Sequence, residues 1–92
     1  VMKGFKDVSW KQHKTWGVGS IQGMLTLDNG IEFSIVAGEF SFGSKNFGVK
    51  ESDFTTFEVA IFGKDGDMVG DPIGWQNRKD IDKLIMEQET KN

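Results

Sequence analysis

Residues 21–35 read IQGMLTLDNGIEFSI. On either side of Asp28-Asn29-Gly30, apolar side chains alternate with more polar ones, a period of two that places one strand face in a core and the other in water. Asn and Gly accept positive φ angles at low cost, so this tripeptide favours the tight primed turn of a β-hairpin. The stretch therefore predicts an antiparallel hairpin at the centre of the protein.

The alternation changes phase just after this hairpin. Apolar residues are odd-numbered as far as Ala37, but the next ones are Phe40 and Phe42. An inserted residue explains the change, and Gly38 is well placed for a β-bulge that returns both phenylalanines to the core side. Residues 43–53 are rich in glycine and polar side chains, which predicts a loop.

A further half-buried strand is predicted over residues 57–61, where Phe, Val and Ile alternate with less apolar residues. Residues 64–67, Lys-Asp-Gly-Asp, supply the turn after it. Residues 68–69 are expected to pair back as a short return strand. Pro72 ends this strand because proline has no amide hydrogen to donate.

From Asn77 onward the apolar period becomes helical. Ile81, Leu84 and Ile85 lie at i, i+3 and i+4, so one face of the segment is apolar. Asn77 is a suitable N-cap, and Asp80 places an acid in the first turn. These signals predict an amphipathic helix over residues 77–90.

The expected fold class is α+β: a small antiparallel β-sheet or partly open barrel of roughly three to five strands, with one C-terminal amphipathic helix. The 92 residues fit a single domain, because a chain this short buries enough surface for only one core. Within it we distinguish a basic N-terminal arm (1–16), with four lysines against one aspartate, a β-rich body (17–73) and the helix (77–90).

Composition restricts the possible functions. The chain has eight Phe, three Trp and no Cys, so aromatic rings supply the core and neither a disulfide nor a thiolate metal site can form. A globule of this size leaves room for surface grooves but not for a deep active site with a lid, which favours a binder over an enzyme. The lack of cysteine suits the cytoplasm, and no apolar run approaches the roughly 18 residues of a membrane span.

No motif predicts catalysis, a cofactor or a metal ion. The single histidine, His13, lies between lysines without a partner set for nucleophilic catalysis, and a structural or merely exposed role is expected. Three aspartates within residues 65–71 suggest calcium, but Val69 stands where the loop needs an oxygen ligand, so a solvated turn is predicted. Residues 17–23 are glycine-rich without the spacing of a dinucleotide fingerprint.

The candidate partner-binding residues are aromatic or basic: Trp10, Trp16, Lys11, Lys14 and Phe47. Tryptophan rings in the arm can stack on bases while lysines contact phosphates, as in single-strand binders. The same rings suit a protein interface, and Phe47 offers a second exposed anchor in a glycine-flanked loop. A third interpretation is that both tryptophans fold back to cap the sheet. We expect a division, with Trp16 largely structural and Trp10 more exposed.

The chain also carries a sequence resemblance. From Asp28-Asn29-Gly30 through residues 34–38 to Phe57-Glu58-Val59-Ala60, and on to a Lys-Asp-Gly turn and a short helix, it resembles a group of small uncharacterised phage-encoded proteins. The resemblance covers roughly residues 27–87, and it departs from the group where Glu39 interrupts a longer glycine-rich stretch. It carries over no functional residue. It implies a context, since small phage proteins often bind a host or phage protein.

We therefore expect a non-enzymatic binding protein, such as a phage accessory protein or inhibitor, that acts on a host or phage protein. One alternative is a nucleic-acid-binding module that uses the basic aromatic arm. Another is a structural or self-assembling component, in which an edge strand pairs with a second copy. No membrane partner and no cofactor are expected.

Overall fold

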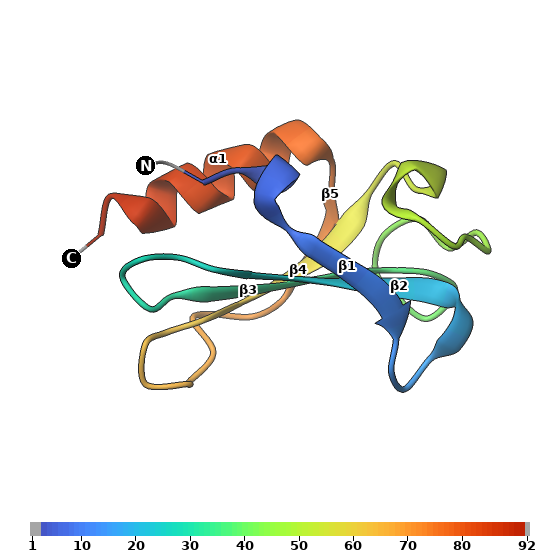
Figure 1. Cartoon of the computed structure of the whole chain (residues 1–92), viewed down its shortest axis with the longest axis horizontal. Helices are drawn as coiled ribbons and strands as arrows, with labels where there is room; N and C mark the ends of the chain where they lie inside the picture. Colours follow the sequence, from blue (N-terminus) through green and yellow to red (C-terminus); the bar gives the residue numbers. More distant parts are fainter. Residues whose placement is uncertain (1–2, 92) are drawn as a thin grey trace.

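The computed structural model of the protein describes residues 3–91. Antiparallel strands form an open sheet in the order β1-β2-β3-β4-β5, so each strand pairs with the next along the chain, and α1 lies over one face (Figure 1). The predicted α+β class with a C-terminal helix is confirmed. The elements are η1 (Phe5–Asp7), β1 (Ser9–His13), β2 (Gly17–Thr26), β3 (Glu32–Ala37), η2 (Glu51–Asp53), β4 (Phe57–Phe62), β5 (Ile73–Gln76) and α1 (Arg78–Glu89).

The core lies between the sheet and α1. In β3 and β4 every second side chain is buried, because successive residues of a strand point to opposite faces. The buried face packs against Ile81 and Ile85 of α1, both fully buried. Phe5 of η1 and Phe54, just before β4, complete this core. The opposite face of the sheet is mostly half-buried.

The predicted hairpin is present, but its turn differs from the prediction. The Leu27 N–H donates to the Ile31 carbonyl (2.8 Å) and the Gly30 N–H donates to the Leu27 carbonyl (3.0 Å). Gly30 has a φ of +90°, whereas Asn29 keeps a negative φ. The loop is therefore a three-residue turn ending in a left-handed glycine. The Asn29 side chain holds this turn both locally and to α1, because its Oδ1 accepts from the Ile31 N–H (3.1 Å) and its amide donates to the Gln88 carbonyl (2.9 Å).

The helix begins where the sequence predicts. The Asn77 side chain accepts from the Asp80 N–H (2.8 Å), and the Asp80 carboxylate accepts from the Asn77 N–H (3.0 Å). This reciprocal capping box satisfies amides that would otherwise lack partners at the first turn. Ile81 and Ile85 then form the apolar face that packs on the sheet.

The return strand lies beyond its predicted position. β5 spans Ile73–Gln76, whereas the predicted strand 68–69 pairs with the end of β4 through one bridge, Phe62–Met68, and a hydrogen bond from the Val69 N–H to the Ile61 carbonyl (2.7 Å). Ile73 packs against the core, but Met68 is 46% exposed. The strand that pairs back is therefore the one whose Ile73 side chain packs against the core, and it follows a longer turn than expected.

The N-terminal segment is not a free arm. Residues 9–13 form β1, an edge strand paired with β2. Ahead of it, the Phe5 N–H donates to the Asp82 carboxylate on α1 (2.7 Å), and the Lys3 ammonium donates to the Thr26 carbonyl (2.8 Å). The apolar period could not reveal this strand, because a single tryptophan is the only apolar side chain in its five residues.

The predicted β-bulge at Gly38 is wrong. β3 ends at Ala37, and Gly38, with φ +137°, starts a loop that continues to β4. The Ser41 N–H and hydroxyl both donate to the Gly38 carbonyl (3.0 and 2.8 Å), so the polar Ser41 turns inward. Phe40 and Phe42 consequently face outward, 62% and 64% exposed, instead of returning to the core.

Arg78, the first residue of α1, fastens this loop to the core. Its guanidinium donates to the Glu51 carboxylate and to the backbone carbonyls of Glu51 and Phe54, both at 2.8 Å. It also lies 5.4 and 5.3 Å from the ring centroids of Phe5 and Phe57, which is within the range of a cation–π interaction. One side chain therefore joins η1, η2, β4 and α1.

We predict that Gly38→Ala lowers the free energy of unfolding by more than about 2 kcal/mol, measured by urea denaturation. A positive φ costs a non-glycine residue roughly 1–2 kcal/mol, and a Cβ at Gly38 would also collide with the Ser20 side chain. Gly66→Ala is the control, because Gly66 has φ +90° but nothing near its Cβ position. Equal losses in the two variants would show that the collision with Ser20 is unimportant.

Candidate functional site

The long loop between β3 and β4 is held in place by its own hydrogen bonds. The Ser44 N–H donates to the Thr56 carbonyl (3.0 Å), and the Ser44 hydroxyl accepts from the N–H groups of Thr55 and Thr56 (3.1 and 2.9 Å). The Gly48 N–H donates to the Gly19 carbonyl of β2 (3.1 Å). The first half of the loop is thereby tied to both neighbouring strands, β2 and β4.

Asp53 closes the second half of the loop. Its carboxylate accepts from the N–H groups of Val49 and Lys50 (2.9 and 3.1 Å), and these donors lower the pKa of the Asp53 carboxyl. The Asn46 amide donates to the Asp53 carbonyl (2.9 Å). Together with the Arg78 contacts, these bonds fix the positions from which the loop presents its side chains.

Large aromatic side chains gather around this loop. Phe40, Phe42 and Phe47 extend from it, and Phe47 is 70% exposed. Trp75 of β5 is 55% exposed, and the half-buried Trp16 ring lies 6.1 Å from that of Phe40. We call these five residues the aromatic surface. Single exposed apolar residues are ordinary, but a group of them marks a binding surface.

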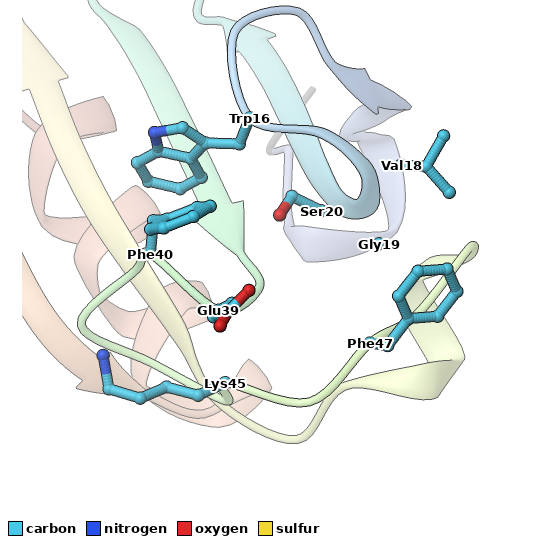
Figure 2. A pocket seen from close by; sticks show the side chains of 8 residues that line it. All are labelled: Trp16, Val18, Gly19, Ser20, Glu39, Phe40, Lys45 and Phe47. Atoms are coloured by element: carbon cyan, nitrogen blue, oxygen red, sulfur yellow. The ribbon is translucent and has the colours of Figure 1, made fainter.

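A hollow of about 300 Å³ lies within the aromatic surface. Figure 2 shows Trp16 and Phe40 on one side of it and Phe47 on the other, with Ser20 and Glu39 between them. Apolar walls with a few polar groups between them are typical of small binding sites. The hollow can therefore take an apolar side chain and still offer hydrogen bonds beside it.

Lys45 links this hollow to the rest of the aromatic surface. It lines the hollow, and its ammonium lies 5.4 Å from the ring centroid of Phe42 and 5.8 Å from that of Trp75. Trp75 has φ +57°, a costly conformation for a residue with a side chain. Its N–H donates to the Phe42 carbonyl (2.7 Å), which helps to hold it there. Backbone strain of this kind concentrates at functional sites.

His13 supports the Trp16 wall of the hollow. Its Nδ1 accepts from the N–H groups of Thr15 and Trp16 (3.2 and 3.0 Å), and its ring stacks on the Trp16 ring with a centroid distance of 4.1 Å. Burial lowers the pKa of His13, which favours the neutral ring whose Nδ1 can accept. His13 therefore has a structural role in the turn between β1 and β2.

The structure places four of the five candidate residues in two hollows. Trp16 and Phe47 line the same hollow. Lys11 is exposed on β1, and Lys14 is exposed in the turn that follows. Trp10 and Lys11 line a second hollow, and the Trp10 ring also packs against the core.

The expected division between the two tryptophans is reversed. The Trp10 ring lies 5.5 Å from the rings of Phe5 and Phe57 and packs against the core, whereas Trp16 lines a surface hollow. Trp10 pairs across the sheet with Gly23, and a Cβ at Gly23 would collide with its ring. A glycine on the neighbouring strand therefore provides the space that Trp10 occupies.

Three members of the aromatic surface were not predicted from the sequence: Phe40, Phe42 and Trp75. Phe40 and Phe42 keep the alternation of a strand, so the pattern alone assigns them to the core. Trp75 lacks a periodic signal, because β5 is short and pairs irregularly with β4. Local composition is the usable signal: residues 40–47 contain three phenylalanines among Ser, Gly, Lys and Asn.

The part of the chain that the structure describes gives little support for metal binding or for a membrane-spanning helix. Within residues 3–91, no three His, Cys, Asp or Glu side chains are placed to hold a metal ion. The Asp65 carboxylate accepts from the Asp67 N–H (3.0 Å) and so shapes its turn. None of the helices in these residues is long and apolar enough to span a membrane.

Comparisons with known proteins give no indication of the function. No family model matches the chain, and no curated protein or solved structure matches it. The aromatic surface and its surroundings are therefore the observations that bear on the function.

The two tryptophans should differ in their contributions to stability. We predict that Trp10→Ala lowers the free energy of unfolding by about 3 kcal/mol, because it removes a ring packed on the core. Trp16→Ala should cost roughly half of that or less, since the aromatic neighbours of its ring, His13 and Phe40, lie at the surface. Denaturant titrations of both single variants provide the measurement, and equal losses would contradict the assignment of Trp10 to the core.

Stability should also depend on His13 at mildly acidic pH. Because burial lowers the pKa of His13 in the folded state, the unfolded chain binds a proton more readily just below the usual pKa of 6.5. The free energy of unfolding should therefore be fully retained above pH 6.5 and fall as the pH drops through this value. Thermal melts across this range test it.

His13→Asn is the matched control, because the Asn side chain can still accept a hydrogen bond but does not titrate. In this variant the decline near pH 6.5 should disappear. Loss of stability at lower pH should remain, since Asp7 and Asp53 have lowered carboxyl pKa values in the folded state. An identical decline in the two proteins would assign the effect to another group.

Proposed function

We propose that the protein is a non-enzymatic binding protein that docks on a partner protein through the aromatic surface. The observation that carries this proposal is the group of exposed rings of Phe40, Phe42, Phe47 and Trp75 around one ordered loop. Exposing several large rings forgoes the free energy that burial would contribute, roughly 25 cal/mol per Å². A partner that covers the surface recovers it.

The order of the loop supports the proposal. Binding is weakened when flexible side chains and loops must be ordered, so a surface that is already fixed binds more tightly. The Ser44, Asp53 and Arg78 contacts provide this order before any partner arrives. The rings therefore suit the role of anchors, since aromatic residues supply much of the energy of protein interfaces.

The residues themselves favour a protein partner over a nucleic acid. Two of the four lysines of the N-terminal segment have partners within the chain: Lys3 lies near Thr26 and Asp28, and Lys6 lies near Asp7. Of the other two, Lys14 is exposed in the β1–β2 turn, and Lys11 lies beside Trp10, whose half-buried ring packs on Phe5 and Phe57 rather than being free to stack on a base. The resemblance in sequence to phage-encoded proteins makes a host or phage protein the first partner to test.

The test compares three forms of the tagged protein in lysates of candidate bacterial hosts. Phe40→Ser with Phe47→Ser should abolish the retention of at least one lysate protein, identified by mass spectrometry, and should leave the free energy of unfolding within about 1 kcal/mol of the parent value. Met86→Ser is the control, because Met86 is also exposed, at 49%, but lies on α1. It should retain the same proteins as the parent.

The salt dependence of retention and the mass of the free protein in solution distinguish this proposal from its alternatives. Retention through apolar contacts should persist as the salt concentration rises, whereas contacts to phosphate would weaken steeply. Light scattering of the free protein would reveal self-association in place of a foreign partner. The proposal fails if the double variant retains the same proteins as the parent, or if the retained material is a nucleic acid.

A further inference from the structure

Two further hollows continue the hollow of the aromatic surface along the molecule. The first shares Val18, Gly19 and Ser20 with it, and the second shares Val49 with the first. Because neighbouring hollows have residues in common, they form one groove. It runs between the β1–β2 side of the sheet and the loop before β4, and we call it the loop groove.

The dimensions of the loop groove alternate. Its two ends measure about 300 and 360 Å³, whereas the middle part measures about 60 Å³. The wide ends are bordered by Phe47 at one end and Trp10 at the other, and the narrow middle by Gly19 and Gly48. Extended chains present side chains at intervals along a narrow backbone. This shape fits two bulky apolar side chains joined by extended backbone.

The charge along the loop groove is mainly positive. Lys45 lines one end, and Lys11 and Lys50 line the other. Of the two lining carboxylates, Glu51 is already paired with Arg78, whereas Glu39 has no ion pair within residues 3–91. The body of the protein is acidic, with a net charge of −3 over the whole chain. The groove is therefore a basic strip on an acidic protein.

We propose that the loop groove binds an extended acidic segment of a partner protein, with carboxylates beside two bulky apolar side chains. The inference rests on the proposed function, because it specifies the partner of the same surface. The lysines complement the carboxylates, the wide ends take the apolar side chains, and the Gln12 amide lies beside the narrow part, where the backbone would pass. The Glu39 carboxylate within the groove disfavours a phosphate backbone, which is charged at every step.

The test selects ligands without assuming their sequence. A displayed library of random heptapeptides is enriched on the immobilised full-length protein, and the affinity of the enriched peptides is measured by fluorescence anisotropy. We expect enriched peptides to combine Asp or Glu with two large apolar residues. Replacing their acids by Gln or Asn should weaken binding at least tenfold at low salt.

Matched charge reversals locate the binding site. Lys11→Glu with Lys50→Glu should weaken the selected peptides at least tenfold. Lys64→Glu with Lys83→Glu makes the same change in net charge at the β4–β5 turn and on α1, away from the groove, and should change the affinity less than twofold. Oligothymidylate, assayed in parallel, should bind more weakly than the selected peptides.

The other outcomes contradict the inference. Enrichment of neutral or basic peptides, no enrichment at all, equal effects of the two double variants, or tighter binding of oligothymidylate would each overturn it. A protein that forms dimers through Phe47 would make a second copy the occupant instead. If no acidic peptide binds, but the Phe40→Ser with Phe47→Ser variant still fails to retain a lysate protein that the parent retains, the proposed function stands. Only the inference of an acidic segment is then wrong.

Discussion

The guanidinium of Arg78 is the contact on which the arrangement of this protein depends. It binds the Glu51 carboxylate, accepts no bond itself, and donates to the carbonyls of Glu51 and Phe54 while lying over the rings of Phe5 and Phe57. The ion pair alone would contribute little, because both side chains are about a third exposed, at 38% and 32%. Its importance comes from geometry, since a planar group with five donors can hold several segments at one point and a lysine cannot.

The positions of the other residues of the site depend on the loop that Arg78 holds. The loop before β4 is held by backbone hydrogen bonds to Gly19, Thr56 and its own residues, and these fix the directions of its exposed side chains. Ser41 fills the interior position and leaves Phe40 and Phe42 on the surface. The groove exists because the same loop runs beside β2, where Gly19 permits the close approach of Phe47. A rigid sheet thus presents a loop rich in exposed rings, which is a common way to build a binding surface.

The fold was accessible to sequence reasoning wherever one local signal dominated. The hairpin of β2 and β3, the strand β4 and the capped helix α1 all follow from periodicity and turn chemistry. The predictions are wrong at Gly38, at the return strand and at the N-terminal arm, where the pairing partner or the burial of a distant residue decides the outcome. The candidate site was half accessible: Trp16 and Phe47 line the same hollow, whereas Trp10 packs against the core and borders only the far end of the groove.

By itself the sequence determined the central hairpin, β4 and α1, because alternation, the Asp28-Asn29-Gly30 turn and the Asn77 cap act over a few neighbouring residues. It also determined that many aromatic rings would serve a small core. Only the tertiary structure decided which rings the core would take. The core of a chain this small can bury only some of its aromatic rings. Trp10 packs in the space beside Gly23, whereas the turn at Gly38 places Phe40 on the surface. That choice depends on contacts between residues far apart in the chain, which local patterns do not record.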